Sequence, residues 1–237
     1  MESLNYDFEI DRFEGLKILR DDMLKGGTKG RFIASLLDPS KHEYVYASPV
    51  EGGFQIALAA VAKQIGKKAT IFCAKRKEPH FNSLRAKREG ARIMQVDFGR
   101  MSNVAKKARL YCEETGAQML QFGANYQPMI DGIATLMKKI SARIGEPEEI
   151  FCAVGSGVLI NGIIQGTVSS KIIGVQVGKK FTQQLPDRAS ILVYPAAFGE
   201  ESKFIAPFEC CRNYDLKALE FAVKLRKSNN SFFWNVL

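Results

Sequence analysis

The sequence predicts an α/β fold of two lobes, each with a mainly parallel sheet flanked by helices. Candidate strands and helices alternate along most of the 237 residues. Several candidate strands are continuous apolar runs, as expected for strands that are buried on both faces. The hydrophobic content of 46% is enough for a sizeable core. No apolar run approaches the ~20 residues that span a bilayer.

The first half of the chain alternates short strands with helices that stop at glycines. Residues 6–24 form a lead-in segment, and a Gly-Gly break then precedes a helix that starts near Lys29. β-branched and aromatic residues predict the strands, and helical spacing with a closing glycine predicts the helices. The expected strands are 44–47, 69–73 and 92–96, and the expected helices are 54–65, 81–89 and 104–115.

The second half continues the alternation. An amphipathic helix is expected over 128–144, because its apolar residues fall on one stripe. The expected strands are 118–122, 150–154, 172–177 and 191–194, and the last helix is expected over 216–225. Phe232, Phe233 and Trp234 follow a polar stretch near the end of the chain. We expect these three aromatic residues to be buried, and we consider burial against a partner chain.

The chain is basic, with 34 lysines and arginines against 25 aspartates and glutamates and a formal net charge of +9. Such an excess favours anionic partners, which include nucleic acids and phosphorylated metabolites. The basic clusters are spread along the chain and do not form one tail. This spread favours the simpler interpretation, in which they are the solvated faces of helices.

Cysteine and histidine usage argues against a metal site and against a disulfide framework. The five cysteines are scattered, and no Cys-x-x-Cys occurs. The two histidines lack the spacing of zinc ligands. The first residues also lack the basic start and apolar core of a signal peptide. We therefore expect no metal and a cytoplasmic location.

The run from Arg20 to Arg31 reads Arg-Asp-Asp-Met-Leu-Lys-Gly-Gly-Thr-Lys-Gly-Arg. Its second lysine, Lys29, is the first candidate functional residue. Lys29 follows a Gly-Gly turn and precedes an apolar run, so it lies at a helix start. Helix starts favour anions, which makes phosphate chemistry near this lysine plausible. A solvated surface lysine in a glycine turn is the alternative interpretation.

A second candidate is a glycine turn later in the chain. Gly155, Ser156 and Gly157 link a buried strand to a helix that begins with Val158 and Leu159. Backbone N–H groups at such a turn point outward together and can hold a phosphate, aided by the helix dipole. A tight turn between a strand and a helix, with no ligand, has the same pattern.

Taken in chain order, these motifs resemble pyridoxal-phosphate enzymes of fold type II, nearest the branch of aminocyclopropane-carboxylate deaminase and cysteine desulfhydrase. In that branch an Arg-Asp-Asp run, a short spacer and Gly-Gly-Asn-Lys-x-Arg carry the cofactor lysine, and Thr28 stands here for the Asn. The resemblance implies that Lys29 is catalytic and carries pyridoxal 5'-phosphate as a Schiff base. It also implies that residues 155–159 bind the cofactor phosphate and that the protein is a homodimer.

The resemblance extends to segments that face the substrate in that family. The loop that opens the second helix would contribute Ser48, Gly52, Gly53 and Gln55 to substrate binding. Tyr214, in a Tyr-x-x-Lys-Ala run, resembles a tyrosine near the end of the deaminase-like proteins. A packed aromatic residue at a helix start is the simpler interpretation of Tyr214.

Three departures from the family pattern concern the cofactor ring and its phosphate. The loop lacks the Asn that faces the ring hydroxyl in the family, and Gly53 or Gln55 falls near its place. Val158 stands where a third glycine or a small residue is common. No Ser or Thr near the chain end is an evident partner for the pyridine nitrogen, although Cys210 or Cys211 could stand there.

By the same resemblance, residues 1–47 and 146–237 are expected to form a larger cofactor-binding lobe, with 48–145 as a smaller inserted lobe. The expected activity is that of a lyase, deaminase or decarboxylase acting at the α-carbon of an amino acid or amino-acid-like group. Because the chain is short and basic, we also consider an amino-acid adduct on a DNA base as the substrate. Small proteins of this type are similar to those of bacteriophage pathways that hypermodify DNA.

Three alternatives stay open. One is a lyase for free amino acids with no nucleic-acid role. Another is a non-catalytic binding protein of the same fold, which the missing Asn motivates. A Rossmann-like nucleotide-binding protein ranks third, because its Gly-x-Gly-x-x-Gly would lie early in the chain with an acid about 20 residues further on.

Overall fold

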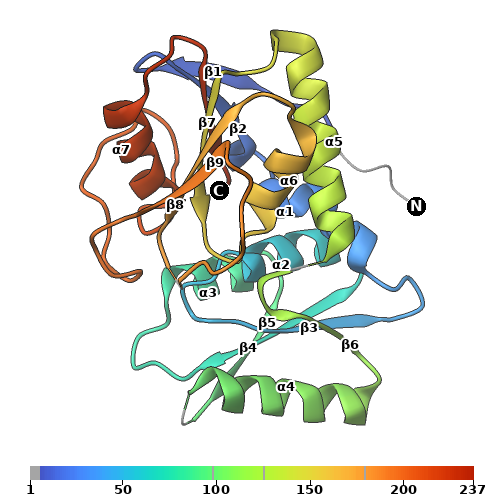
Figure 1. Cartoon of the computed structure of the whole chain (residues 1–237). Helices are drawn as coiled ribbons and strands as arrows, with labels where there is room; N and C mark the ends of the chain where they lie inside the picture. Colours follow the sequence, from blue (N-terminus) through green and yellow to red (C-terminus); the bar gives the residue numbers. More distant parts are fainter. Residues whose placement is uncertain (1–5, 98, 125, 179) are drawn as a thin grey trace. The chain divides into compact units, whose positions relative to one another are not determined.

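The computed structural model describes residues 6–97, 99–124, 126–178 and 180–237. Contacts divide the chain into two compact units, Lys25–Ala124 and a second unit made of residues 6–24 and 126–237. Each unit has its own sheet and its own covering helices (Figure 1). The predicted α/β class, with parallel-rich sheets flanked by helices, is confirmed.

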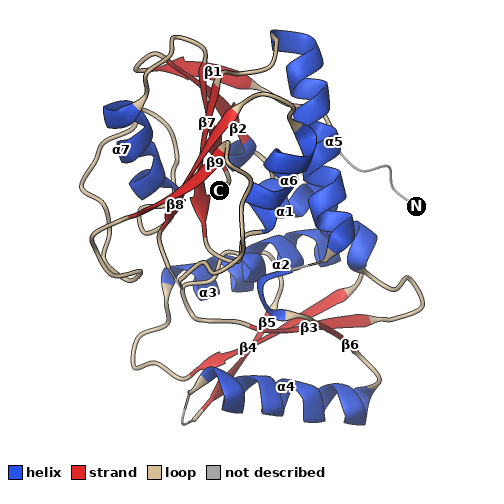
Figure 2. Ribbon diagram, viewed as in Figure 1, coloured by secondary structure: helices blue, strands red, loops and turns tan. Residues whose placement is uncertain are grey.

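The unit Lys25–Ala124 is built on a four-stranded parallel sheet in the order β5-β4-β3-β6. The strands are β3 (Glu43–Ala47), β4 (Lys68–Ala74), β5 (Arg92–Val96) and β6 (Gln118–Leu120). Helices α2 (Phe54–Gln64) and α3 (Phe81–Arg88) cover one face, and α4 (Met101–Thr115) covers the other (Figure 2). The short helix α1 (Gly27–Phe32) packs against α2. The two central strands are buried on both faces, which explains their apolar sequences.

The second unit holds a six-stranded sheet in the order β1-β2-β10-β7-β8-β9. Its pairs are parallel except for the antiparallel pair of β1 and β2. The strands are β1 (Ile10–Phe13), β2 (Leu16–Arg20), β7 (Glu149–Val154), β8 (Lys171–Gln176), β9 (Ala189–Val193) and β10 (Ser231–Asn235). Helices α5 (Gln127–Ile144) and α6 (Val158–Gly166) lie on one side of this sheet and α7 (Asp215–Leu225) lies on the other (Figure 1).

Strand β10 is an element that the sequence did not predict. It lies in the middle of its sheet, parallel to both β2 and β7. Phe232, Phe233 and Trp234 have no exposed surface there, and the indole N–H of Trp234 donates to Asp21 Oδ2 at 3.2 Å. The expectation that these residues are buried by a partner chain is therefore wrong, because the chain's own sheet buries them.

The unit boundaries differ from the expected lobes at two places. Residues 25–47 belong with the four-stranded sheet, because β3 pairs with β4 and β6. Helix α5 belongs to the other unit, because it packs closely along α6. Glycines of α6 make that approach possible: a Cβ on Gly162 would come within 2.5 Å of the Ile133 side chain. A Cβ on Gly166 would come within 2.7 Å of the Ala134 carbonyl oxygen.

Candidate active site

Lys29 lies on α1 and is half-buried. The turn before this helix is made by Gly26 and Gly27, whose φ angles of 82° and 62° suit glycine and strain other residues. Gly26 also touches α2, where an added Cβ would come within 2.7 Å of the Cα of Ala57. The glycine pair therefore holds the helix of Lys29 close against α2.

The loop before α2 is closed by its own hydrogen bonds. Ser48 is fully buried, and its hydroxyl donates to the carbonyl oxygen of Pro49 at 2.8 Å. The Gln55 amide nitrogen donates to the carbonyl oxygens of Val50 and Gly52, each at 2.9 Å. Gln55 has no exposed surface, and its Oε1 has no hydrogen-bond partner among the described residues. The Gln55 side chain therefore shapes the loop.

In the other unit, the turn Gly155-Ser156-Gly157 connects β7 to α6. Gly157 is the N-cap of α6 with φ 90°, and no side chain caps the helix. The first N–H groups of a helix, here those of Val158 and Leu159, have no acceptor within the helix. Such a terminus binds an anion through its N–H groups and through the helix dipole.

The loop after β8 is fastened beside this turn. A Cβ on Gly157 would come within 2.6 Å of the Phe181 ring, so only glycine leaves room for that ring. The backbone N–H of Phe181 donates to Gln176 Oε1 at 2.7 Å. Asn161 of α6 donates to Gln183 Oε1 at 2.8 Å. These bonds order the loop next to the start of α6.

Tyr214 touches the same turn. A Cβ on Gly155 would come within 3.0 Å of the Tyr214 hydroxyl oxygen, and a backbone hydrogen bond joins Gly155 to the phenol. Burial, reinforced by the charge of Asp215, raises the pKa of Tyr214 far above its usual value. The Phe198 ring packs edge-on against Tyr214, with 6.5 Å between the ring centroids. Tyr214 is therefore a neutral hydroxyl at the glycine turn.

Asp215 is a candidate that sequence reasoning missed. It opens α7 directly after Tyr214 and has no exposed surface. Burial raises the pKa of the Cys152 and Cys210 thiols, and the charge of Asp215 raises it further. The carboxylate therefore lies among both thiols and the Tyr214 phenol. Its signal in the sequence is an acid inside the Tyr-x-x-Lys-Ala run, at the start of an otherwise apolar helix.

Lys217 is a buried cation two residues further along α7. Its Nζ donates to the carbonyl oxygen of Ala197 at 2.7 Å and lies 5.2 Å from the Tyr194 ring centroid. Burial lowers the pKa of this ammonium group. The bond ties down the loop that carries Phe198, which in turn packs on Tyr214. We therefore regard Lys217 as a positioning residue for Tyr214.

The predicted site residues fall into two groups in different units. Lys29 and the loop residues Ser48, Gly52, Gly53 and Gln55 belong to Lys25–Ala124. Residues 155–159 and Tyr214 belong to the other unit, where Tyr214 touches the turn. The described part of the chain contains no cluster of three His, Cys, Asp or Glu side chains that could hold a metal. Its helices include none that is long and apolar enough to cross a membrane.

Two mainly parallel sheets covered by helices, a lysine on a short helix and a glycine turn suited to phosphate are the features expected of a fold type II pyridoxal-phosphate protein. A family model described as "Pyridoxal-phosphate dependent enzyme" matches residues 26–201, and the chain belongs to that family. No curated protein sequence matches the chain.

Solved structures show the same fold at low sequence identity. A homologue of ACC deaminase is 16% identical with a TM-score of 0.79, and the alignment covers 98% of this chain and 90% of that one. Maize serine racemase is 17% identical with a TM-score of 0.70, covering 97% and 87%. The processed form of threonine deaminase isoform 2 from Solanum lycopersicum is 20% identical with a TM-score of 0.57, covering 69% and 47%.

The residues present fit the cofactor of this family. The turn at 155–159 has glycines at positions 155 and 157, and the first N–H groups of the helix behind it have no acceptor within that helix. Asp215 is a buried carboxylate, which is a suitable partner for a protonated pyridine nitrogen.

Proposed function

We propose that this protein is a pyridoxal-phosphate-dependent lyase acting at the α-carbon of an amino acid or amino-acid-like group. The observation that carries the proposal is that the family match at 26–201 includes both Lys29 and the glycine turn. The local structure of each supports its role. Lys29 stands on a helix that a glycine pair holds against α2, and the turn leaves helix N–H groups for an anion.

Pyridoxal phosphate, when bound, supplies an electron sink for the negative charge that develops at the substrate α-carbon. The Lys29 amine would hold the cofactor through its aldehyde. When the substrate amine takes that place, the Lys29 amine would remove or return the proton at the substrate α-carbon. The backbone N–H groups of residues 155–159 would hold the cofactor phosphate.

Other residues are assigned by their local surroundings. The loop with Ser48, Gly52 and Gly53 binds the substrate carboxylate, and Gln55 holds that loop in shape. Asp215 would favour a proton on the ring nitrogen, because a buried carboxylate stabilises a nearby cation. Tyr214 remains a neutral hydroxyl and can donate a hydrogen bond beside the turn.

Two forms of the substrate are compatible with this machinery. One is a free amino acid, which is deaminated, decarboxylated or cleaved by elimination. The other is an amino-acid adduct on a DNA base, of the kind made in bacteriophage DNA hypermodification. The net charge of +9 favours the second form, because it suits a polyanionic partner. We also propose that the protein forms a homodimer and acts in the cytoplasm.

The test is reduction of the protein with borohydride after incubation with pyridoxal phosphate, followed by peptide mass spectrometry. The reduced cofactor should be found on Lys29, and Lys29→Ala should remove it. Lys25→Ala is the matched control, because Lys25 is an exposed lysine on the same turn and should leave labelling unchanged. Labelling elsewhere, or none, would support the non-catalytic alternative. Proton exchange at the α-carbon without a new product would indicate a racemase.

A further inference from the structure

The net charge of the chain is confined to one of its two units. Residues 25–124 hold 18 of the 34 lysines and arginines but only 8 of the 25 aspartates and glutamates, which leaves +10. The remaining residues hold 16 basic and 17 acidic side chains and are nearly neutral. The excess therefore gathers in one unit, as expected of a surface that binds an anionic partner.

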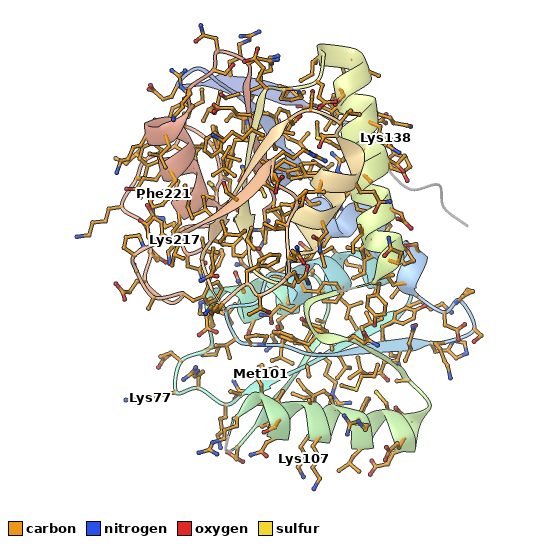
Figure 3. The ribbon with its side chains drawn as sticks, in the orientation of Figure 1. Lys77, Met101, Lys107, Lys138, Lys217 and Phe221 are labelled. Carbon is orange, nitrogen blue, oxygen red and sulfur yellow. The ribbon has the colours of Figure 1, made fainter. Side chains whose placement is uncertain are left out.

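The excess is concentrated between the end of β4 and the middle of α4. Residues 75–109 carry eleven lysines and arginines against three aspartates and glutamates. Because Ala74 pairs with Val96, the segments that leave β4 and β5 start at the same end of the sheet. Figure 3 shows Lys77 and Lys107 projecting outward from this unit. We call five exposed cations the basic edge: Lys75, Arg76, Lys77, Lys87 and Arg88.

A pocket of about 310 Å³ opens within the basic edge, beside α3 and the strands β4 and β5. Arg76 and Lys87 line it, together with His80 and the buried residue Ser83. The Arg76 guanidinium is 3.9 Å from the carboxylate of Glu51, and the arginine side chain is 56% exposed. A pair so exposed is weak and screened, so Arg76 can bind another anion. The two cations can form charge-assisted hydrogen bonds with a phosphate, and a hydroxyl and an imidazole are further groups that can bind one.

An exposed aromatic ring stands on the same helix. Phe81 is 59% exposed at the start of α3, and the Arg88 guanidinium lies 6.0 Å from its ring centroid. An exposed ring beside an arginine can stack on a nucleobase, which adds to the affinity for a nucleic-acid strand. Inorganic phosphate and a lipid headgroup have no base that could stack on that ring.

We propose that the basic edge binds a nucleic-acid strand, with a backbone phosphate beside Arg76 and Lys87 and a base stacked on Phe81. This inference rests on the proposed function: if the substrate is an amino-acid adduct on a DNA base, the basic edge binds the strand that carries it. Binding itself requires neither the cofactor nor Lys29, so the two ideas can fail separately.

The test is fluorescence anisotropy of labelled single-stranded and duplex oligonucleotides with the full chain, over a series of salt concentrations. Arg76→Ala/Lys87→Ala is compared with Lys138→Ala/Lys203→Ala, which removes the same charge from exposed sites of the nearly neutral unit. The first pair should make the slope of log K against log salt shallower by about 2 and weaken binding about tenfold or more near 0.1 M salt. The control pair should change neither by much.

Phe81→Ala separates stacking from charge. It should weaken binding of the single strand about fivefold or more while leaving the salt slope unchanged. Circular dichroism of every variant establishes that it is folded. A folded Phe81→Ala variant with unchanged affinity would remove the stacked base from the proposal.

Equal losses in the two double variants, or no nucleic-acid binding at low salt, would overturn the inference. Binding to phosphatidylserine vesicles without binding to nucleic acid would also overturn it, because the basic edge would then be a membrane contact. Borohydride labelling of Lys29 in the same samples separates the two proposals. If Lys29 is labelled but nucleic acid is not bound, the proposed enzyme function stands and the nucleic-acid proposal fails. If nucleic acid is bound but Lys29 is not labelled, the nucleic-acid proposal stands and the enzyme function fails.

Discussion

Glu146 offers a quantitative test of the local structure around α6. Its carboxylate accepts the backbone N–H groups of Val168, Ser169 and Ser170 at 3.1, 2.6 and 2.8 Å, which fastens the loop between α6 and β8. Burial acts in the opposite direction, but these N–H groups lower the pKa of Glu146 from 4.5 to about 2. The variant Glu146→Gln keeps the shape of the side chain and removes its charge.

The expected loss follows from the pKa. A fall from 4.5 to about 2 corresponds to roughly 3 kcal/mol between the charged and neutral carboxyl, at about 1.4 kcal/mol per pKa unit. Partial exposure screens the charge, so we expect Glu146→Gln to lower the free energy of unfolding by about 2 kcal/mol at pH 7. The folded pKa is depressed, so this contribution is complete above pH 4.5 and disappears as the pH falls through about 2.

Urea unfolding followed by tryptophan fluorescence measures this loss. Trp234 is the single tryptophan, is fully buried and belongs to the same unit as Glu146. The control is Glu148→Gln, because Glu148 is exposed and glutamine can still accept the Ser228 hydroxyl that now bonds it at 2.8 Å. A change below about 0.5 kcal/mol is expected for that control. The reasoning would be refuted by equal losses in both variants, or by a Glu146→Gln loss that stays constant down to pH 2.

Three further changes concern the candidate site. Gly157→Ala should weaken cofactor binding at least tenfold by absorbance titration, because its Cβ would meet the Phe181 ring at 2.6 Å. The control is Gly116→Ala, which has a similar φ of 71° and no atom within 4 Å of the added Cβ, and it should only lower stability by about 1 kcal/mol. Asp215→Asn should keep the cofactor but shift its visible absorption and lower turnover about 100-fold or more, and an unchanged spectrum would count against the assigned role. Lys217→Met should lower the free energy of unfolding by about 1–3 kcal/mol, because the Ala197 carbonyl oxygen loses its donor, and an unaltered urea midpoint would show that the bond is unimportant.

Local patterns were enough for elements with a strong signal in the chain itself. The helix expected at 54–65 is α2 (Phe54–Gln64), and the strand expected at 69–73 is β4 (Lys68–Ala74). Both are apolar enough to be buried wherever they pack. The stop at Gly116 is equally local, because this residue closes α4 with φ 71°, a conformation that favours glycine.

Other elements needed partners that are distant in the sequence. Residues 231–235 become strand β10 because β2 and β7 supply its hydrogen bonds from far along the chain. The boundaries of the units were also beyond local reasoning. They depend on which sheet β3 joins and on how the glycines of α6 receive α5.

The sequence by itself determined the fold class, the lysine motif and the glycine turn, because each is a short run whose residue types carry the signal. Only the tertiary structure showed that Gln55 points into its own loop, that Asp215 lies buried beside Tyr214, and that the positive charge gathers in one unit. Burial and hydrogen bonding are relations between residues that are distant in the chain. They exist once the sheets and helices have closed around them, and no local pattern contains them.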